Sequence, residues 1–309
     1  MLPLWADLRA TSMRYKVLIL ALLAACSVRC QKADEDEERC NENCTVEEKP
    51  MPQMVDSMEF AGRMVRFDNW DMRERMEREM ISFATSHQTS ILILKKAPRY
   101  LPEIRKILRE EGIPEDFVYL CVIECNLNAT AKSGVGAAGF WQFMEGTARE
   151  YHLEVNDCID ERYNIEKSTR AACKYLKNSY ARFGDWMAVA ASYNAGMGRI
   201  HGELEKQRVD DIFDLWLNNE TSRYLFRLLA AKMMIETPEN FGFGNIGECY
   251  KPIDTEIIEV TCDIADLTVW AKEHGTTYRM VRLLNPWLKS RRLCNKSGKR
   301  YKVAIPAKN

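Results

Sequence analysis

The sequence has no excess of charge of either sign and no apolar run long enough to cross a membrane as a helix. Its 309 residues include 44 lysines and arginines against 45 aspartates and glutamates. Because no overall basic field attracts the chain to nucleic acid, a nucleic-acid partner is not expected. The apolar run Val17–Leu23 is much shorter than the roughly 20 residues that a membrane-spanning helix needs.

The composition indicates an ordinary folded protein. Hydrophobic residues make up 46% of the chain and charged residues 29%, values near the average for soluble domains. These shares argue against disorder, collagen-like repeats and a multi-span membrane protein. A chain of 309 residues is long enough for one domain of ordinary size and a smaller second one.

The region around residues 13–26 has the order of an export signal. A basic start at Arg14 and Lys16 precedes the apolar run Val17–Leu23, and two alanines stand directly before Cys26. This end resembles the lipobox of bacterial lipoprotein signals, which implies that Cys26 carries a lipid anchor. The residues before Met13 fit no signal pattern, so Met13 is a candidate initiator alongside the first methionine.

The 11 cysteines favour an oxidising compartment, in which disulfides persist. Without Cys26 an even number remains, which permits pairing but gives no connectivity. Cys40 and Cys44 have no nearby histidine or second close cysteine pair to complete a tetrahedral set. We therefore expect no metal site in the chain.

Changes in composition divide the chain into five segments. A signal peptide over residues 1–25 is followed by an acidic, extended tether over 26–57. Apolar residues spaced three and four apart predict a helical domain over 58–243. A glycine-containing link over 244–255 leads to a second domain at 256–309, where the pattern changes abruptly.

The last segment predicts the order strand, helix, helix, strand. Alternation at Ile257–Val260 and extended character at Tyr301–Ile305 indicate the strands, and helical patterns occupy Leu267–Lys272 and Met280–Leu284. The fold class expected from the sequence is therefore mainly α, with a small βααβ domain at the end.

Glu124 directly follows the stretch Phe117–Ile123, which is apolar on every face and typical of a buried helix. A carboxyl group there must be paired, hydrogen-bonded or kept protonated by a raised pKa. A structural ion pair is one interpretation. The other is a glycosidase acid, which needs a raised pKa to hold a proton near neutral pH.

Several motifs downstream of Glu124 occur in the order found in lytic transglycosylases. They are the glycine- and alanine-rich turn Ser133–Met144, the segment Asp160–Arg162 with Lys167–Thr169, the motif Ser192–Gly196, and Glu220–Tyr224. Over about residues 66–243 the chain resembles the soluble lytic transglycosylase domain, in particular its membrane-bound D-type branch. The resemblance implies a lysozyme-like α-helical catalytic domain.

In that family a single glutamate acts twice, and the matching residue here is Glu124. The acid protonates the bond between N-acetylmuramic acid and N-acetylglucosamine, and its carboxylate then takes a proton from the muramoyl 6-hydroxyl as a 1,6-anhydro ring closes. No cofactor is implied. The nearby acids Asp157, Asp160 and Glu161 match a structural segment, so no second catalytic acid is expected.

The resemblance also implies substrate-binding residues in the cleft. They are Gln142, Tyr193, Asn194, Gly196 and Tyr224. Tyr193 and Asn194 are expected to face the substrate acetamido group and the catalytic glutamate. The small residues of the turn are expected either to let backbone approach a sugar or to form a plain turn, and Trp141 and Phe143 are expected in the core.

The chain departs from the family at two places near this site. Cys125 replaces the serine that follows the catalytic glutamate, and Glu145 replaces a proline after the turn. The thiol of Cys125, one helical turn after Cys121, is expected to be packed or oxidised. A Cys125 nucleophile with His152 as its base is an alternative that nothing in the spacing requires.

The C-terminal segment resembles a LysM module, a class that binds glycans containing N-acetylglucosamine. The resemblance rests on Leu267–Lys272, Leu284–Trp287 and Val303–Pro306, whereas Ala265–Leu267 departs from the usual Gly-Asp-Thr. A hypothesis is that Cys262 and Cys294 form a disulfide that staples this small domain.

Together these observations predict a lipid-anchored peptidoglycan lytic transglycosylase of the cell envelope, at the periplasmic face of the outer membrane. Its partners are expected to be peptidoglycan glycan strands and, through the anchor, the membrane. Two alternatives stay open: a muramidase that hydrolyses the same bond, and a non-catalytic scaffold that binds peptidoglycan.

Overall fold

The computed structural model describes residues 51–295 and 298–307. The predicted signal peptide, the anchor residue Cys26 and the tether up to residue 50 lie outside these ranges. Within the described ranges, no helix combines the length and apolar character that crossing a membrane requires.

The described chain begins with an antiparallel hairpin and not with a helix. Strand β1 (Ser57–Phe60) pairs with β2 (Arg63–Arg66). The turn between them has positive φ at Ala61 (54°) and Gly62 (82°), as tight hairpin turns require. Phe60 is fully buried on the face that packs against the helices. The prediction of helical structure from residue 58 was therefore wrong for this segment.

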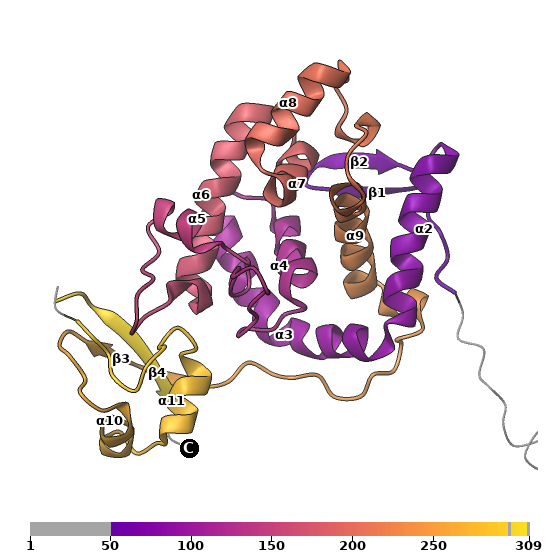
Figure 1. Cartoon of the computed structure of the whole chain (residues 1–309). Coiled ribbons are helices and arrows are strands. Elements are labelled where there is room, and N and C mark those ends of the chain that lie inside the picture. The colour runs from indigo at the N-terminus through magenta and orange to yellow at the C-terminus, as the bar shows by residue number, and fades with distance from the viewer. Residues whose placement is uncertain (1–50, 296–297, 308–309) are drawn as a thin grey trace, which may run out of the picture. The chain divides into compact units, whose positions relative to one another are not determined.

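The helical domain follows the hairpin (Figure 1). Its helices are α2 (Trp70–Thr85), α3 (His87–Glu110), α4 (Val118–Cys125), α5 (Glu145–Glu150), α6 (Ile165–Phe183), α7 (Trp186–Ala195), α8 (Met197–Gln207) and α9 (Asn219–Glu236). Four short 3-10 segments lie between or after them, η1 (Glu115–Phe117), η2 (Glu161–Tyr163), η3 (Ile212–Asp214) and η4 (Pro238–Phe241).

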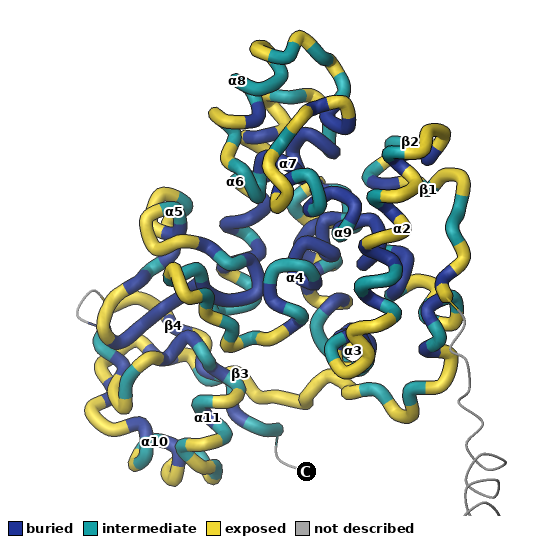
Figure 2. Tube along the Cα trace, turned by 45° about the vertical axis from the view of Figure 1, so that its right-hand side comes forward, coloured by how far each residue is buried: buried dark blue, intermediate teal, exposed yellow. Residues whose placement is uncertain are grey.

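Helix α4 lies in the core of this domain, in contact with α3 and α9 (Figure 2). Its residues Val118 to Val122 are fully buried, in agreement with their apolar character on every face. The helix ends because Asn126 adopts the left-handed conformation (φ 51°), and its N–H donates to the carbonyl of Val122. Glu124 is thereby placed in the last turn of a buried helix.

The small C-terminal domain has the predicted order of elements. Strand β3 (Thr255–Val260) pairs antiparallel with β4 (Tyr301–Pro306), and helices α10 (Leu267–Glu273) and α11 (Tyr278–Leu284) lie between them in sequence. Asp266 and Thr277 cap the two helices with their side-chain oxygens. The prediction of a mainly α chain that ends in a βααβ unit is confirmed.

The disulfide of this domain differs from the hypothesis. Cys294 pairs with Cys158 of the helical domain, 136 residues away in sequence, and Cys262 is free and exposed. The physical reason is that Cys158 and the adjacent Ile159 are buried in the apolar core of the small domain. A pairing of Cys262 with Cys294 is therefore wrong.

The link between the two domains follows helix α3. The N–H of Tyr250 donates to the carbonyl of Lys95 over 2.8 Å, and the Lys95 ammonium donates to the carbonyl of Glu248 over 2.9 Å. The Arg99 guanidinium donates to the carbonyl of Lys251 over 2.9 Å. These contacts fix an irregular segment on the surface of the helical domain.

Candidate active site

The centre of the site is a hydrogen bond between helices α4 and α9. The hydroxyl of Tyr224 donates to a carboxyl oxygen of Glu124 over 2.6 Å. Glu124 is partly buried and Tyr224 is buried. Two residues that the sequence selected, 100 positions apart, are therefore in direct contact.

The electrostatics around Glu124 favour its neutral form. Burial raises the pKa of Glu124 to about 7, against the opposing hydrogen bond from Tyr224 and the positive charge of Arg227, while the negative charge of Glu220 raises it further. A carboxyl group with a pKa near 7 is substantially protonated at neutral pH and can donate that proton.

Tyr193 belongs to the same cluster. It lies on α7, and its hydroxyl donates to the carbonyl of Trp141 over 2.7 Å. Burial, and next the charge of Glu124, raise the pKa of Tyr193 well above its ordinary value. The phenol therefore stays neutral between the glycine-rich turn and the carboxyl group.

Asn194 is held by the first turn of α9. Its side-chain oxygen accepts from the hydroxyl of Thr221 over 2.9 Å, and its amide donates to Glu220 over 3.4 Å. Gly196 follows at the junction of α7 and α8, with φ at 86°, which favours glycine. The motif Ser192–Gly196 is thus fixed against α9, the helix that carries Tyr224.

Gln142 is oriented by its own turn. Its amide nitrogen donates to the carbonyl of Gly139 over 2.8 Å, and its backbone has a positive φ of 46°. The amide also donates to the carbonyl of Ala131 over 3.4 Å. Gln142 is therefore bound to the turn and to a residue before its start, whereas Tyr224 and Tyr193 contact or approach Glu124. A positive φ is costly for a residue other than glycine and is often found at functional sites.

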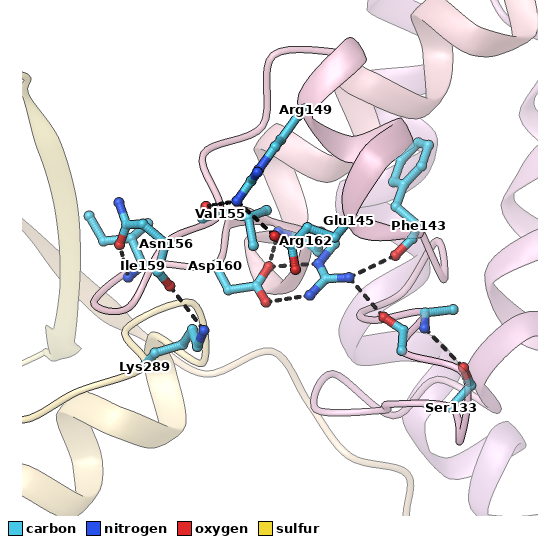
Figure 3. Close-up of polar contacts among 12 residues, drawn as sticks. Ser133, Phe143, Glu145, Arg149, Val155, Asn156, Ile159, Asp160, Arg162 and Lys289 are labelled. Atoms are coloured by element: carbon cyan, nitrogen blue, oxygen red, sulfur yellow. Dashed lines mark hydrogen bonds and ion pairs between the residues drawn. The ribbon is translucent and has the colours of Figure 1, made fainter.

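Buried side chains hold the glycine-rich turn against the core of the helical domain. Trp141 is fully buried and its indole N–H donates to Thr169 over 2.9 Å, and Phe143 is also buried, as expected for core residues. Figure 3 shows Arg162 beside this turn, with its guanidinium directed at the carbonyl of Phe143 (3.1 Å).

Cys125 is packed and not poised for nucleophilic chemistry. Its thiol donates to the carbonyl of Cys121 over 3.1 Å, and both cysteines are free and buried. Burial raises the pKa of Cys125 to about 12, which disfavours the thiolate. His152 is exposed. The alternative of a Cys125–His152 pair therefore has no support in this geometry.

Arg227 is a site residue that the sequence interpretation missed. It follows Tyr224 by three positions on α9 and is therefore on the same helix face. Its charge acts on Glu124, and its buried Nε has no hydrogen-bond partner among the described residues. The spacing from Tyr224 was the available signal, but only the fold shows that this face is turned to Glu124.

Two sequence families match the chain. Residues 103–215 match the Transglycosylase SLT domain, and residues 256–309 match the Soluble lytic transglycosylase C-terminal LysM-like domain.

Similar proteins cover part of the chain. Membrane-bound lytic murein transglycosylase D of Escherichia coli (strain K12) is 27% identical over 180 residues, which are 57% of this chain and 39% of that protein. Peptidoglycan transglycosylase gp16 of Escherichia phage T7 is 36% identical over 131 residues, 41% of this chain and 10% of that protein. This chain therefore spans less than half the length of either relative. The solved 70 kDa soluble lytic transglycosylase of Escherichia coli aligns with 18% identity over 57% of this chain and 33% of that one, with a TM-score of 0.41.

Proposed function

We propose that this chain, which carries a transglycosylase SLT domain followed by a LysM-like domain, cleaves peptidoglycan glycan strands as a lytic transglycosylase. The observation that carries the proposal is the carboxyl group of Glu124. It lies within the residues that match the SLT domain, is partly buried, has a pKa of about 7 and accepts a hydrogen bond from Tyr224.

In the proposed reaction Glu124 serves first as acid and then as base. The protonated carboxyl group donates to the oxygen of the β-1,4 bond between N-acetylmuramic acid and N-acetylglucosamine as that bond breaks. The carboxylate then accepts the proton of the muramoyl 6-hydroxyl, and the oxygen of that hydroxyl group forms a bond to C1 of the same sugar. The product has a 1,6-anhydro end and no water is consumed.

The neighbouring residues have distinct proposed roles. Tyr224 orients the carboxyl group and stabilises the carboxylate that forms after the first proton transfer. Tyr193 and Asn194 bind the substrate acetamido group, Gln142 binds a sugar hydroxyl, and Gly196 keeps the turn after α7 open to the glycan. The contacts of Tyr193 and Asn194 described above support these roles because they fix both side chains.

Product analysis on purified sacculi tests the proposal. Mass spectrometry of digests should detect anhydro-ended fragments with the wild-type protein and none above background with Glu124→Gln, which keeps the shape of the side chain but cannot donate the proton. The control is Glu77→Gln, which changes an exposed glutamate of α2 and should leave the products unchanged.

Two other results would replace the proposal. Products with reducing ends would indicate a muramidase that uses water. Equal inactivity of the wild-type protein and Glu124→Gln on several peptidoglycans, together with binding to sacculi, would indicate a non-catalytic scaffold.

The proposal includes the organisation of the full chain. We assign a signal peptide to residues 1–25, a tether to 26–57, the catalytic domain to 58–243, the link to 244–255 and the glycan-binding domain to 256–309. A lipid on Cys26 would hold the enzyme in the cell envelope, at the periplasmic face of the outer membrane. Radiolabelled palmitate should enter the wild-type chain and not Cys26→Ser, and equal labelling of both would remove the anchor from the proposal.

A further inference from the structure

The small domain is docked on one segment of the helical domain, residues 154–160. Besides the disulfide between Cys158 and Cys294, the backbone pairs Ile159 with Leu288. The N–H of Asp160 donates to the carbonyl of Trp287, and the N–H of Lys289 donates to that of Cys158, each over 2.8 Å. These are backbone contacts of the kind that join neighbouring strands.

Charged side chains reinforce the same interface. The Lys289 ammonium donates to the carbonyl of Asn156 over 2.9 Å (Figure 3). Glu154 accepts from Lys299 over 2.8 Å and from the hydroxyl of Tyr301 over 2.9 Å. Partial burial opposes the charge of Glu154, but these two partners hold its pKa below the ordinary value.

The docked segment is also part of the small domain's core. Cys158 and Ile159 are buried in one apolar cluster with Val260, Leu267 and Val281. A segment of the helical domain thus completes the core of a domain too small to bury much apolar surface alone. The interface is therefore a packed junction as well as a polar one.

The other side of the segment holds the glycine-rich turn. Asp160 and Arg162, 2% and 5% exposed, form a buried pair with two bonds of 2.7 and 2.9 Å between their side chains. The remaining nitrogen of Arg162 donates to the carbonyl of Gly136 over 2.9 Å and to that of Phe143 over 3.1 Å. One side chain therefore joins both ends of the turn to the docked segment.

We propose that the LysM-like domain braces the turn of residues 136–143 through the docked segment, and that Arg162 is the positioning residue that carries this link. The proposal rests on the function proposed above, because this turn carries Gln142. Docking fixes the position of the Asp160 backbone, and the Asp160 carboxylate fixes the orientation of the Arg162 guanidinium. The guanidinium in turn holds the carbonyl groups of Gly136 and Phe143 in place. The C-terminal domain thereby tunes substrate binding without reaching Glu124.

Hydrogen exchange on the whole protein tests the link without requiring catalysis. In Lys289→Met/Lys299→Met, the amides of Ala138 and Gly139, which donate to Phe143 and Ala131, should exchange about fivefold faster. The matched control, Lys272→Met/Lys251→Met, removes two exposed lysines that make no contact with the docked segment in the described structure. It should leave exchange in the turn unchanged.

Arg162→Lys tests the positioning residue itself. Lysine keeps a charge for Asp160 but lacks the planar fork that donates to several acceptors at once. Exchange in the turn should again be about fivefold faster, with KM for glycan raised by a similar factor and kcat and its pH dependence unchanged.

The outcomes separate the parts of the proposal. Unchanged exchange in both Lys289→Met/Lys299→Met and Arg162→Lys would overturn it. Faster exchange in Arg162→Lys alone would show that Arg162 holds the turn without the LysM-like domain, which also overturns the brace. A protein with no activity on peptidoglycan but the expected exchange pattern would contradict the proposed function and leave the brace intact.

Discussion

At the scale of single residues, the apolar sequence around Glu124 made two of its properties predictable, its burial and its raised pKa. A carboxyl group in the last turn of a buried helix loses hydration, so its proton is held more tightly. The sequence indicated that this residue was either paired or protonated. In the structure its direct partner is a tyrosine, a neutral donor, and not a cation.

Glu124 should make stability depend on pH in a window set by its own titration. Its pKa is about 7 in the folded chain, against about 4.5 for an unperturbed glutamate, the value expected in the unfolded chain. Between these values the folded chain binds more protons, so the free energy of unfolding falls as pH rises. Glutamine does not titrate. Relative to wild type, Glu124→Gln should therefore gain up to about 3 kcal/mol between pH 4 and pH 8.

Urea unfolding at both pH values measures this gain. Glu77→Gln, at an exposed site, should show the same pH dependence as the wild-type protein. A constant difference between wild type and Glu124→Gln at pH 4 and pH 8 would show that Glu124 titrates normally and would remove the basis for its role as the acid.

Tyr224 should control the alkaline limit of activity. Its hydrogen bond stabilises the carboxylate of Glu124 and so lowers the pKa that burial raises. In Tyr224→Phe the acid form should persist to higher pH. The alkaline limb of kcat/KM should move upward by about one pH unit, the equivalent of one charged hydrogen bond of about 1.5 kcal/mol, while kcat falls. A limb that moves to lower pH would contradict this assignment.

The position of Arg227 beside Glu124 could not be predicted from the sequence. Its spacing from Tyr224 was the only signal in the sequence, and most of the 18 residues of α9 are buried, so burial does not single out one face of this helix. Only the packing of α9 against α4 determines that the face of Tyr224 and Arg227 meets Glu124.

At the scale of elements, the sequence predicted secondary structure correctly where the pattern of apolar residues was unambiguous. Helix α4, whose apolar residues face every direction, and the alternating strands of the small domain were both found. The hairpin β1–β2 was missed because each strand has only four residues, and alternation over so few positions gives little signal against a helical region. Gly62, which has a φ of 82° in the turn, was the one turn signal in this segment.

One glycine of the glycine-rich turn, Gly139, is required by the packing of the turn itself. A Cβ at Gly139 would lie 1.9 Å from the carbonyl oxygen of Arg162, at a φ of 79°. Gly139→Ala must therefore displace the segment that Arg162 occupies, at a cost of about 3 kcal/mol or more. Gly134→Ala is the control because a Cβ there meets nothing within 4 Å.

Urea midpoints at constant m-value compare these two variants. A loss of stability in Gly139→Ala with little change in Gly134→Ala is expected. Equal stability of both would mean that the approach to Arg162 relaxes freely. The idea that small residues exist here to admit a sugar thus applies less to Gly139 than to the exposed Gly134.

At the scale of the whole molecule, the family resemblance was predictable and the domain junction was not. Four motifs downstream of Glu124, in the order found in the family, predicted a lytic transglycosylase domain, and the family matches over residues 103–215 and 256–309 confirm that resemblance. The junction depends on which surface the small domain covers. Cys262 lies in the same domain as Cys294 and is the cysteine nearest to it in the sequence, but it is not its disulfide partner.

The disulfide between Cys158 and Cys294 should stabilise the two domains as one unit. It closes a separation of 136 residues and so restricts the unfolded chain, an effect of typically about 2–4 kcal/mol. Reductant should lower the melting temperature of the wild-type protein, because the small domain loses its covalent tie to the segment that completes its core. Cys158→Ser/Cys294→Ser should melt at that lower temperature with or without reductant.

Cys262→Ser serves as the control, since the thiol of Cys262 is free and exposed. This variant should match the wild-type protein in both conditions. Equal melting of the wild-type protein and the double variant under oxidising conditions would show that packing and backbone pairing hold the junction without the covalent bond.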